Sequence, residues 1–277
     1  MPSISIAELI GAYNLKDFGA RGEGNGDDAR KINDALAQIA AKSPANGLAF
    51  LPPGTYMIYT PIVIPSNVIL MGFGSVSVLQ LGPSIDDDVV KSTNTTNIRI
   101  RDLRIDGNRA NNTTRNRYGL WLYGVTDAWI ENVEVVSCRS DGFRLDSCTR
   151  VDLNGCKASD NGRHGFSLSQ SEFCQLMAPR SYDNSQVEAV GTGDGINLEL
   201  ISFDNTIINP VCYETALTGD KQGWGLREAV GESCARTNVI GGSFRGNRTG
   251  SISLESGDSL ALSSPLIQLP GGATITP

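Results

Sequence analysis

The chain has 277 residues, 31 of them glycine, with 6% aromatic residues and a formal net charge of −7. This length suits one large domain, and the composition favours many short strands and turns over a helical bundle. Nucleic acid is excluded as the expected partner, because no run of Lys or Arg is present to neutralise phosphates.

The termini and the apolar runs bear on where the protein works. No stretch approaches the ~18 apolar residues of a membrane span, so we expect no membrane partner. The opening "MPSISIAELIGAY" lacks the basic segment and long apolar core of a convincing signal peptide. The protein would then be cytosolic, exported by another route or carried on a particle such as a virion, and of these we expect an extracellular or virion-associated location.

The N-terminal part predicts one strand and a capping helix over residues 13–46. The stretch "NGDDARKINDALAQIAAK" places Asn25 or Asp27 near a helix N-cap. An apolar stripe follows at helical spacing, and it consists of Ile32, Ala35, Leu36 and Ile39. We expect this helix to cover the N-terminal end of a core. The stretches "FLPPGTYMI" and "PIVIPSNVILMGFG" predict the first strands after it.

A repeat of 23 residues organises the centre of the chain. Gly119, Gly142 and Gly165 are 23 residues apart, and longer coils open at Gly195 and Gly225. After each glycine, apolar residues alternate at a period of two, as in a strand: Leu120 and Leu122, Phe143 and Leu145, Phe166 and Leu168, Ile196 and Leu198. This pattern predicts an all-β fold, a right-handed parallel β-helix with coils over 47–260 and a tail over 261–277, in a single domain over 1–277.

One polar position and six cysteines also follow the repeat. The polar position holds Asn108, Cys138, Asn161, Asn184 and Asn247. Stacked asparagines predict a ladder of amide hydrogen bonds between coils, and the alternative is a row of ligands. No cysteine pair has metal-binding CxxC spacing, so we expect the six cysteines to be small buried residues.

Outward positions of the first strand form three rows of functional side chains. The rows are Trp121, Arg144, Ser167, Asn197 and Arg227; Tyr123, Asp146, Ser169 and Glu199; and Tyr118, Asp141 and His164. Aromatic rings stack on sugars and arginine binds carboxylates bidentately, so these rows predict a groove for a polysaccharide. The alternative for Trp121 and Tyr123 is contact with another subunit, which leaves self-association open.

The stretches "YNLKDFGARGEGNGDD", "LAFLPPGTY" and "IPSNVILMGFG" resemble the pectate-lyase-like right-handed β-helix superfamily. This superfamily includes bacterial polysaccharide lyases and epimerases, and phage tailspike depolymerases share the N-terminal pattern. Residues 13–170, with "RDLRIDGNRANNTTRNRYG", are similar to the catalytic module of bacterial mannuronan C5-epimerases. The resemblance implies an enzyme acting on an acidic polysaccharide.

The catalytic tetrad of that family is not matched. The family's "YG-x-D-P-H" stretch carries a catalytic Tyr, Asp and His, and a preceding loop supplies a Lys. These positions hold Asp141, Arg144 and Asp146, and the Lys falls near Arg115 or Arg117. The resemblance therefore implies the fold, while the residues for any reaction have to come from this chain.

The first functional hypothesis is β-elimination or C5 epimerisation of a uronate polysaccharide. His164, beside Asp141, or Asp146 would be the base, Tyr118 the proton donor, and Arg144 with Arg115 or Arg117 the carboxylate neutralisers. Trp121, Tyr123, Asn197 and Glu199 would contact the substrate. Calcium assistance is compatible with Asp141 and Asp146, and no other cofactor is implied.

The same residues also allow purely structural roles and two other functions. His164 would then be a turn residue bonded to Asp141 or backbone, and Arg144 would pair with Asp146. Asp146 and Glu199 lie two coils apart, roughly 9–10 Å by strand spacing, which is near the carboxylate separation of inverting glycosidases. The third hypothesis is a non-catalytic β-helix that binds glycan or only assembles.

Overall fold

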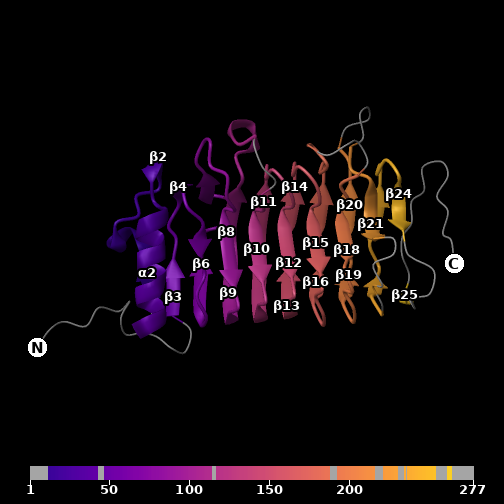
Figure 1. Cartoon of the computed structure of the whole chain (residues 1–277), viewed down its shortest axis with the longest axis horizontal. Helices are drawn as coiled ribbons and strands as arrows, with labels where there is room; N and C mark the ends of the chain where they lie inside the picture. The colour runs from indigo at the N-terminus through magenta and orange to yellow at the C-terminus, as the bar shows by residue number, and fades with distance from the viewer. Residues whose placement is uncertain are drawn as a thin grey trace, which may run out of the picture.

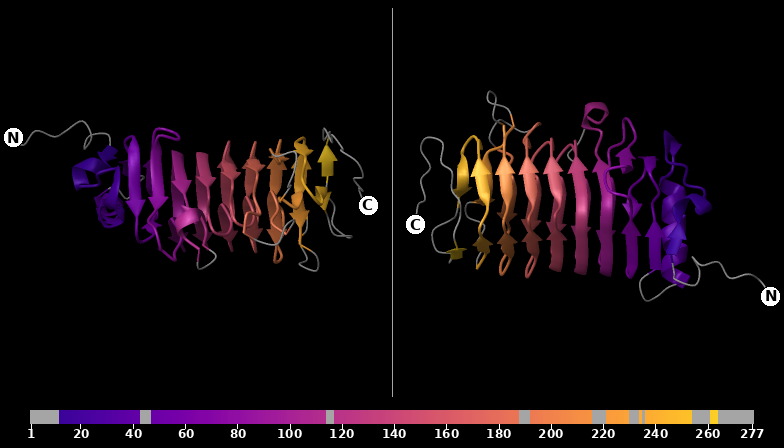
Figure 2. Two further views of the ribbon diagram at one scale, coloured as in Figure 1. Left: turned by 90° about the horizontal axis from the view of Figure 1, so that it is seen from above. Right: turned by 180° about the vertical axis from the view of Figure 1, so that it is seen from behind.

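The computed structural model describes residues 12–42, 47–113, 117–187, 192–215, 221–229, 234, 236–253 and 261–263. They form a right-handed parallel β-helix whose coils stack along the long axis of the molecule (Figure 1). Views from above and from behind show the same succession of coils from the N-terminal to the C-terminal end (Figure 2). The predicted fold class is confirmed.

One face of the described solenoid is an eight-stranded parallel sheet. In the central coils the strand begins at the residue after Gly119, Gly142, Gly165 or Gly195. The strands are β5 (Ile62–Val63), β8 (Val90–Thr93), β10 (Leu120–Tyr123), β12 (Phe143–Asp146), β15 (Phe166–Ser169), β18 (Ile196–Glu199), β21 (Trp224–Glu228) and β24 (Gly250–Ser253).

The rest of each coil belongs to a second, larger parallel sheet that bends at a corner. Before the corner lie β1 (Ala12–Asn14), β3 (Gly47–Phe50), β6 (Val68–Met71), β13 (Thr149–Asn154), β16 (Gln175–Met177), β19 (Thr206–Ile208), β22 (Asn238–Ile240) and β25 (Ala261–Ser263). After it lie β2 (Glu23–Asp27), β4 (Gly54–Ile58), β7 (Ser77–Leu81), β14 (Lys157–Ser159), β17 (Arg180–Tyr182), β20 (Val211–Tyr213) and β23 (Ser243–Arg245). The long strands β9 (Thr96–Asp106) and β11 (Thr126–Val136) run through the corner.

The α-helix α2 (Ala29–Lys42) closes the N-terminal end of the core (Figure 1). The predicted stripe of Ile32, Ala35, Leu36 and Ile39 is fully buried. Of the two expected caps, Asp27 is the one that binds: its Oδ1 accepts the Ala29 amide hydrogen at 2.9 Å. The short 3-10 helices are η1 (Leu15–Phe18) and η2 (Arg109–Asn111). Among the residues described, no helix has the length and apolar character needed to cross a membrane.

The core consists of the predicted inward rows. Leu120 pairs with Phe143 and Leu122 with Leu145 in the parallel register, and all four are buried. The rings of Phe143 and Phe166 stack at 4.7 Å between neighbouring coils. All six cysteines are buried and free, as expected for small core residues.

The repeating glycine is explained by close approach between coils. A Cβ on Gly119 would lie 2.8 Å from the Gly142 carbonyl oxygen, and one on Gly142 would lie 2.8 Å from that of Gly165. The same contact would be 2.7 Å between Gly165 and Gly195. Since real Cβ atoms are not found at such distances from backbone, only glycine fits this column.

The asparagine ladder is confirmed in part and extended. Asn161 donates from Nδ2 to Asn184 Oδ1 at 3.0 Å, and Asn184 donates in turn to Gln222 Oε1 at 2.9 Å. Gln222 then donates to Asn247 at 2.7 Å, a step that the sequence did not reveal. Asn108 instead donates to the backbone of Leu81. These buried amides satisfy one another and align the coils.

The C-terminal end differs from the expected boundary. β25 pairs with β22 through Asn238 and Ala261, so the larger sheet continues into the segment where we predicted a tail. The single-domain organisation over 1–277 stays a prediction.

Candidate functional site

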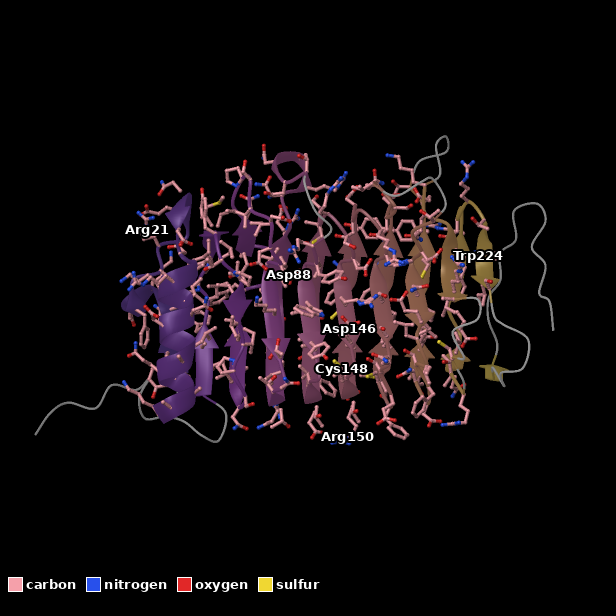
Figure 3. The ribbon with its side chains drawn as sticks, viewed as in Figure 1. Arg21, Asp88, Asp146, Cys148, Arg150 and Trp224 are labelled. Carbon is pink, nitrogen blue, oxygen red and sulfur yellow. The ribbon has the colours of Figure 1, made fainter. Side chains whose placement is uncertain are left out.

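The outward rows lie in the predicted register on the eight-stranded sheet. Trp121, Arg144, Ser167, Asn197 and Arg227 are neighbours in one row, and Tyr123, Asp146, Ser169 and Glu199 in the next. Asp146 lies near the middle of the stack of coils, between Asp88 and Trp224 (Figure 3). We call the surface formed by these rows the outer face.

Arg144 lies at the centre of the outer face and is bound by three carboxylates. Its Nε donates to Asp146 Oδ1 at 2.7 Å, and its Nη1 donates to Glu199 Oε1 and to Ser167 Oγ. Asp141 Oδ2 lies 3.6 Å from the same Nη1. Burial opposes the charge, but Asp146, Glu199 and Asp141 outweigh it and raise the pKa of Arg144. This geometry favours the ion-pair interpretation over a free arginine that waits for a sugar carboxylate.

Further hydrogen bonds hold the two carboxylates that reach the outer face. Trp121 Nε1 donates to Asp146 Oδ2 at 2.7 Å, and Asn197 Nδ2 donates to Glu199 Oε2 at 3.1 Å. Their side chains remain 18% and 13% exposed. Two hydrogen bonds and one guanidinium hold the nearest oxygens of Asp146 and Glu199 no more than roughly 8 Å apart.

Behind the outer face, the position before the repeating glycine, where Val89 replaces glycine after Asp88, forms a row with three buried acidic members. The row extends beyond the predicted Tyr118, Asp141 and His164 to include Asp88, Asp194 and Trp224, as backbone hydrogen bonds between coils show. Asp88, Asp141 and Asp194 each accept the amide hydrogen of the residue one coil on. Burial raises the pKa of Asp141 to about 6 and that of Asp194 to about 7, although nearby arginines oppose the shift.

His164 lies within this buried row and is 2% exposed. Its amide donates to Asp141 Oδ1 at 3.1 Å, and its Nδ1 accepts the Asp194 amide hydrogen at 2.9 Å. Burial, with Arg163, Arg144 and Arg227 nearby, lowers the pKa of His164 well below its usual value. A neutral, enclosed imidazole favours the turn-residue interpretation over that of a base in contact with substrate.

Three aromatic side chains cross the outer face at one coil. Tyr118 and Trp121 have ring centroids 6.2 Å apart, and Trp121 and Tyr123 are 5.9 Å apart. Tyr123 is 42% exposed, while Tyr118 and Trp121 are half-buried. Burial raises the pKa of Tyr118, so its hydroxyl keeps a proton at neutral pH. This strip can contact a sugar ring beside Asp146.

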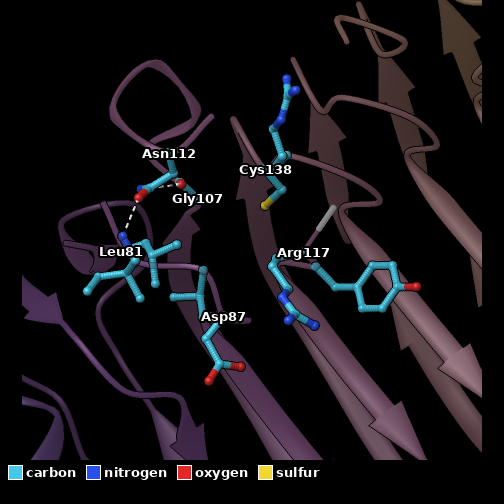
Figure 4. Close-up of a pocket in the computed structure, with 10 residues that line it drawn as sticks. Leu81, Asp87, Gly107, Asn112, Arg117 and Cys138 are labelled. Atoms are coloured by element: carbon cyan, nitrogen blue, oxygen red, sulfur yellow. Dashed lines mark hydrogen bonds between the residues drawn. The ribbon is translucent and has the colours of Figure 1, made fainter. Parts of the chain in front are cut away.

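The two arginines expected from the preceding loop do not join this cluster in the described residues. Arg115 lies outside the part of the chain that the structure describes. Arg117 Nε donates to the Asp86 carbonyl at 3.2 Å and lies 3.4 Å from Asp86 Oδ1. It lines a cavity of about 10 Å³ with Asp87, Asn112 and Cys138, which is space for roughly one water molecule (Figure 4). This placement assigns Arg117 to the acidic loop of the neighbouring coil.

The acidic residues do not fit a calcium site. Both oxygens of Asp146 accept hydrogen bonds, from Arg144 and Trp121, and Asp141 uses Oδ1 for the His164 amide. In the described ranges no three acidic, histidine or cysteine side chains gather as metal ligands would. Calcium prefers six or more oxygen ligands, which this cation-filled site does not offer.

Three residues near the outer face were absent from the predicted catalytic and substrate-binding residues, namely Arg163, Asp194 and Arg227, of which Arg227 was predicted only as a member of an outward row. Arg163 approaches Glu199 Oε2 at 3.9 Å, and Arg227 Nη1 lies 3.7 Å from the buried carboxylate of Asp194. Asp194 precedes Gly195 as Asp141 precedes Gly142, so extending the pre-glycine row by one coil would have found it. Arg163 carries no such signal, because it lies in a turn outside the strand register.

The buried acidic row predicts a pH dependence of stability. The carboxyl pKa values of Asp141 and Asp194 rise from 3.8 to about 6 and about 7, so the folded state binds more protons than the unfolded state in this window. Their contribution therefore lowers the unfolding free energy as pH rises from about 4 to 7.

The Asp194→Asn variant should gain stability over the wild type between pH 5 and pH 8, measured by urea unfolding. Asp127→Asn, at an exposed ion pair, is the control. An unchanged difference at the two pH values would contradict the prediction.

The chain is similar in sequence to known polysaccharide-modifying proteins. The family model described as rhamnogalacturonase A/epimerase, pectate lyase-like, matches residues 12–244. Mannuronan C5-epimerase AlgE5 of Azotobacter vinelandii is 33% identical over 224 residues, covering 73% of this chain. The chain spans only 21% of that protein's length.

Solved structures share the fold. The A-module of the Azotobacter vinelandii mannuronan C-5 epimerase AlgE4 has a TM-score of 0.75 at 24% identity, over 91% of this chain and 70% of that module. Gene product 12 of bacteriophage phi29 has a TM-score of 0.67 at 18% identity, over 90% of this chain and 34% of that protein. Since the family model matches most of the chain, the chain belongs to the rhamnogalacturonase A/epimerase, pectate lyase-like family.

Proposed function

We propose that this chain binds an acidic, uronate-containing polysaccharide on its outer face and modifies it by β-elimination or C5 epimerisation. The observation that carries the proposal is the meeting of an aromatic strip, two partly exposed carboxylates and several arginines on one face. The family and the 33% identity to a mannuronan C5-epimerase support this substrate class.

Both reactions begin with removal of the proton at C5 of the uronate. We assign the base to Asp146 or Glu199, because these carboxylates reach the outer face and His164 does not. The electron pair left at C5 delocalises into the sugar carboxylate, whose charge a cation must stabilise. Tyr118 would then donate its proton, either to the leaving glycosidic oxygen in elimination or to the opposite face of C5 in epimerisation. Arg144 acts in this scheme as a positioning residue for both carboxylates.

A second candidate, hydrolysis with inversion, is favoured by one observation. Asp146 and Glu199 are both partly exposed on the outer face, and the upper limit of roughly 8 Å between their nearest oxygens overlaps the range of about 6.5–9.5 Å for inverting glycosidases. In that mechanism one carboxyl group protonates the leaving oxygen and the other activates water.

Product analysis on polymannuronate and on neutral glycans tests the proposal. New absorbance near 232 nm is expected for elimination, and C5 proton exchange from D₂O without chain scission is expected for epimerisation. Reducing ends without absorbance would indicate the hydrolase. Binding without any product would leave a glycan-binding module and contradict an enzymatic role.

The Glu199→Gln variant should lower turnover about 10²–10⁴-fold if Glu199 transfers a proton, because the amide cannot accept one. Initial rates on the substrate identified above measure this effect. Glu131→Gln, on β11 in the larger sheet, is the matched control and should keep wild-type turnover. Full activity of Glu199→Gln would reassign the base to Asp146.

We also propose that the protein works outside a cell or on a virion, where such polysaccharides are reached. The proposed substrate class supports this location. The likeness to phi29 gene product 12 concerns the fold alone.

A further inference from the structure

Arg163 and Arg227 differ from Arg144 in how they are held. Their side chains are 38% and 30% exposed, against 9% for Arg144. Their ion contacts, 3.9 Å to Glu199 and 3.7 Å to Asp194, are longer than the roughly 2.7–2.9 Å of a charge-assisted hydrogen bond. Both guanidinium groups therefore keep donors available to a ligand.

Arg227 lies beside one carboxylate that is fully enclosed, and Arg163 is near enough to act on the same group electrostatically. The Asp194 side chain is 0% exposed, and its Oδ1 accepts the Trp224 amide hydrogen at 2.8 Å. Its Oδ2 accepts no hydrogen bond from the described residues, although Arg227 Nη1 and His164 Nδ1 lie 3.7 Å and 3.6 Å away. A buried carboxylate with so little hydrogen bonding is costly to keep ionised.

We propose that Arg163 and Arg227 together bind a carboxylate of the acidic polysaccharide, and that Asp194 takes up a proton as the sugar carboxylate replaces it as their counter-ion. This inference rests on the proposed function and identifies the residues that distinguish acidic from neutral sugars. Arg144 is excluded from that role because its side chain is buried and its Nε and Nη1 donors already serve Asp146, Glu199 and Ser167.

The charges around Asp194 make the exchange balanced. One ligand carboxylate enters, one proton from solvent binds Asp194, and the net charge of the site does not change. The groups that face Asp194 are Arg227 from β21, Arg163 and His164 from the preceding coil, and Asp141 one coil further. His164 Nδ1 already accepts the Asp194 amide hydrogen, so the neutral imidazole adds no charge to the exchange. Burial raises the pKa of Asp194 to about 7, so protonation near neutral pH is accessible.

Calorimetric titration with an oligomannuronate, and with the same oligosaccharide after carboxyl reduction, tests the anion site. Arg163→Gln and Arg227→Gln should each weaken oligomannuronate binding about tenfold, with little change for the reduced oligosaccharide. Arg227→Lys should recover part of the loss because it restores the charge. Arg150→Gln, at an exposed ion pair between β13 and Asp127 of β11, is the matched control.

Titration in two buffers of different ionisation enthalpy at pH 7 tests the proton exchange. The wild type should take up a fraction of a proton with oligomannuronate, and its affinity should fall as pH rises from 6 to 8. Asp194→Asn keeps Oδ1 for the Trp224 amide, so it should fold, bind more tightly at pH 8 and take up no proton.

The outcomes separate the inference from the function. Unchanged oligomannuronate affinity in both arginine variants, or equal losses for the acidic and reduced oligosaccharides, would overturn the inference while leaving polysaccharide binding intact. If the wild type bound neither oligosaccharide, the proposed function itself would fail. Proton uptake that persists in Asp194→Asn would remove Asp194 from the exchange.

Discussion

The Arg144→Met variant is expected to lose about 3–5 kcal/mol of unfolding free energy at pH 8, because removing one partner of a buried ion pair leaves uncompensated charge. Here three carboxylates lose their shared cation, and all three have side chains less than one-fifth exposed. Burial raises the pKa of Asp141 to about 6, so its share of the repulsion is lost on protonation and the loss of stability should shrink as pH falls from 8 towards 5.

Urea unfolding at both pH values measures this effect. Arg150→Met is the matched control, since Arg150 on β13 pairs with Asp127 on β11 and both side chains are more than half exposed. Removing such a pair is expected to cost about 0–1 kcal/mol. A variant that remains as stable as the wild type but binds acidic glycans poorly would instead restore Arg144 as a direct sugar ligand.

The second large effect concerns the glycine column. In Gly165→Ala, the new Cβ would lie 2.0 Å from Ser181 Oγ and 2.7 Å from the Gly195 carbonyl oxygen. Relieving these contacts requires the two coils to move apart. The buried side-chain nitrogen of Asn184 lies 3.0 Å from the new Cβ and would be displaced as well. We expect a destabilisation of about 3 kcal/mol, at the upper end of the range for overpacking.

The comparison variant is Gly74→Ala, where no atom lies within 4 Å of the added Cβ. Its φ of +71° still penalises an L-residue, by about 1–2 kcal/mol. Circular dichroism during urea unfolding should therefore rank Gly165→Ala as the more damaging change. The reverse order would show that backbone conformation, and not coil spacing, sets the requirement for glycine.

The fold and the outward rows could be predicted because they depend on local periodicity. Alternation at a period of two fixed which side of each strand Phe143 and Arg144 occupy, and the glycine spacing fixed the register between coils. The same arithmetic placed Glu199 beside Ser169 despite a longer coil.

Partner choice within the site could not be predicted in the same way. The contact between Arg144 and Glu199 joins residues 55 positions apart and two coils distant. Whether Arg144 points to a ligand or to that carboxylate depends on side-chain packing, which spacing does not encode. His164 was misleading for a related reason: its pre-glycine position is buried, and only the structure shows how deeply.

Because inward and outward side chains alternate along each strand, the residues that form the core are separate from those that face a ligand. The positions that hold a tyrosine, aspartate and histidine in the epimerase motif hold Asp141, Arg144 and Asp146 here, while the interleaved Phe143 and Leu145 still pack inside. Substitutions can therefore change the outward residues of such a fold row by row while the core stays the same. Members of the family are better classified by their outward rows than by their shared core.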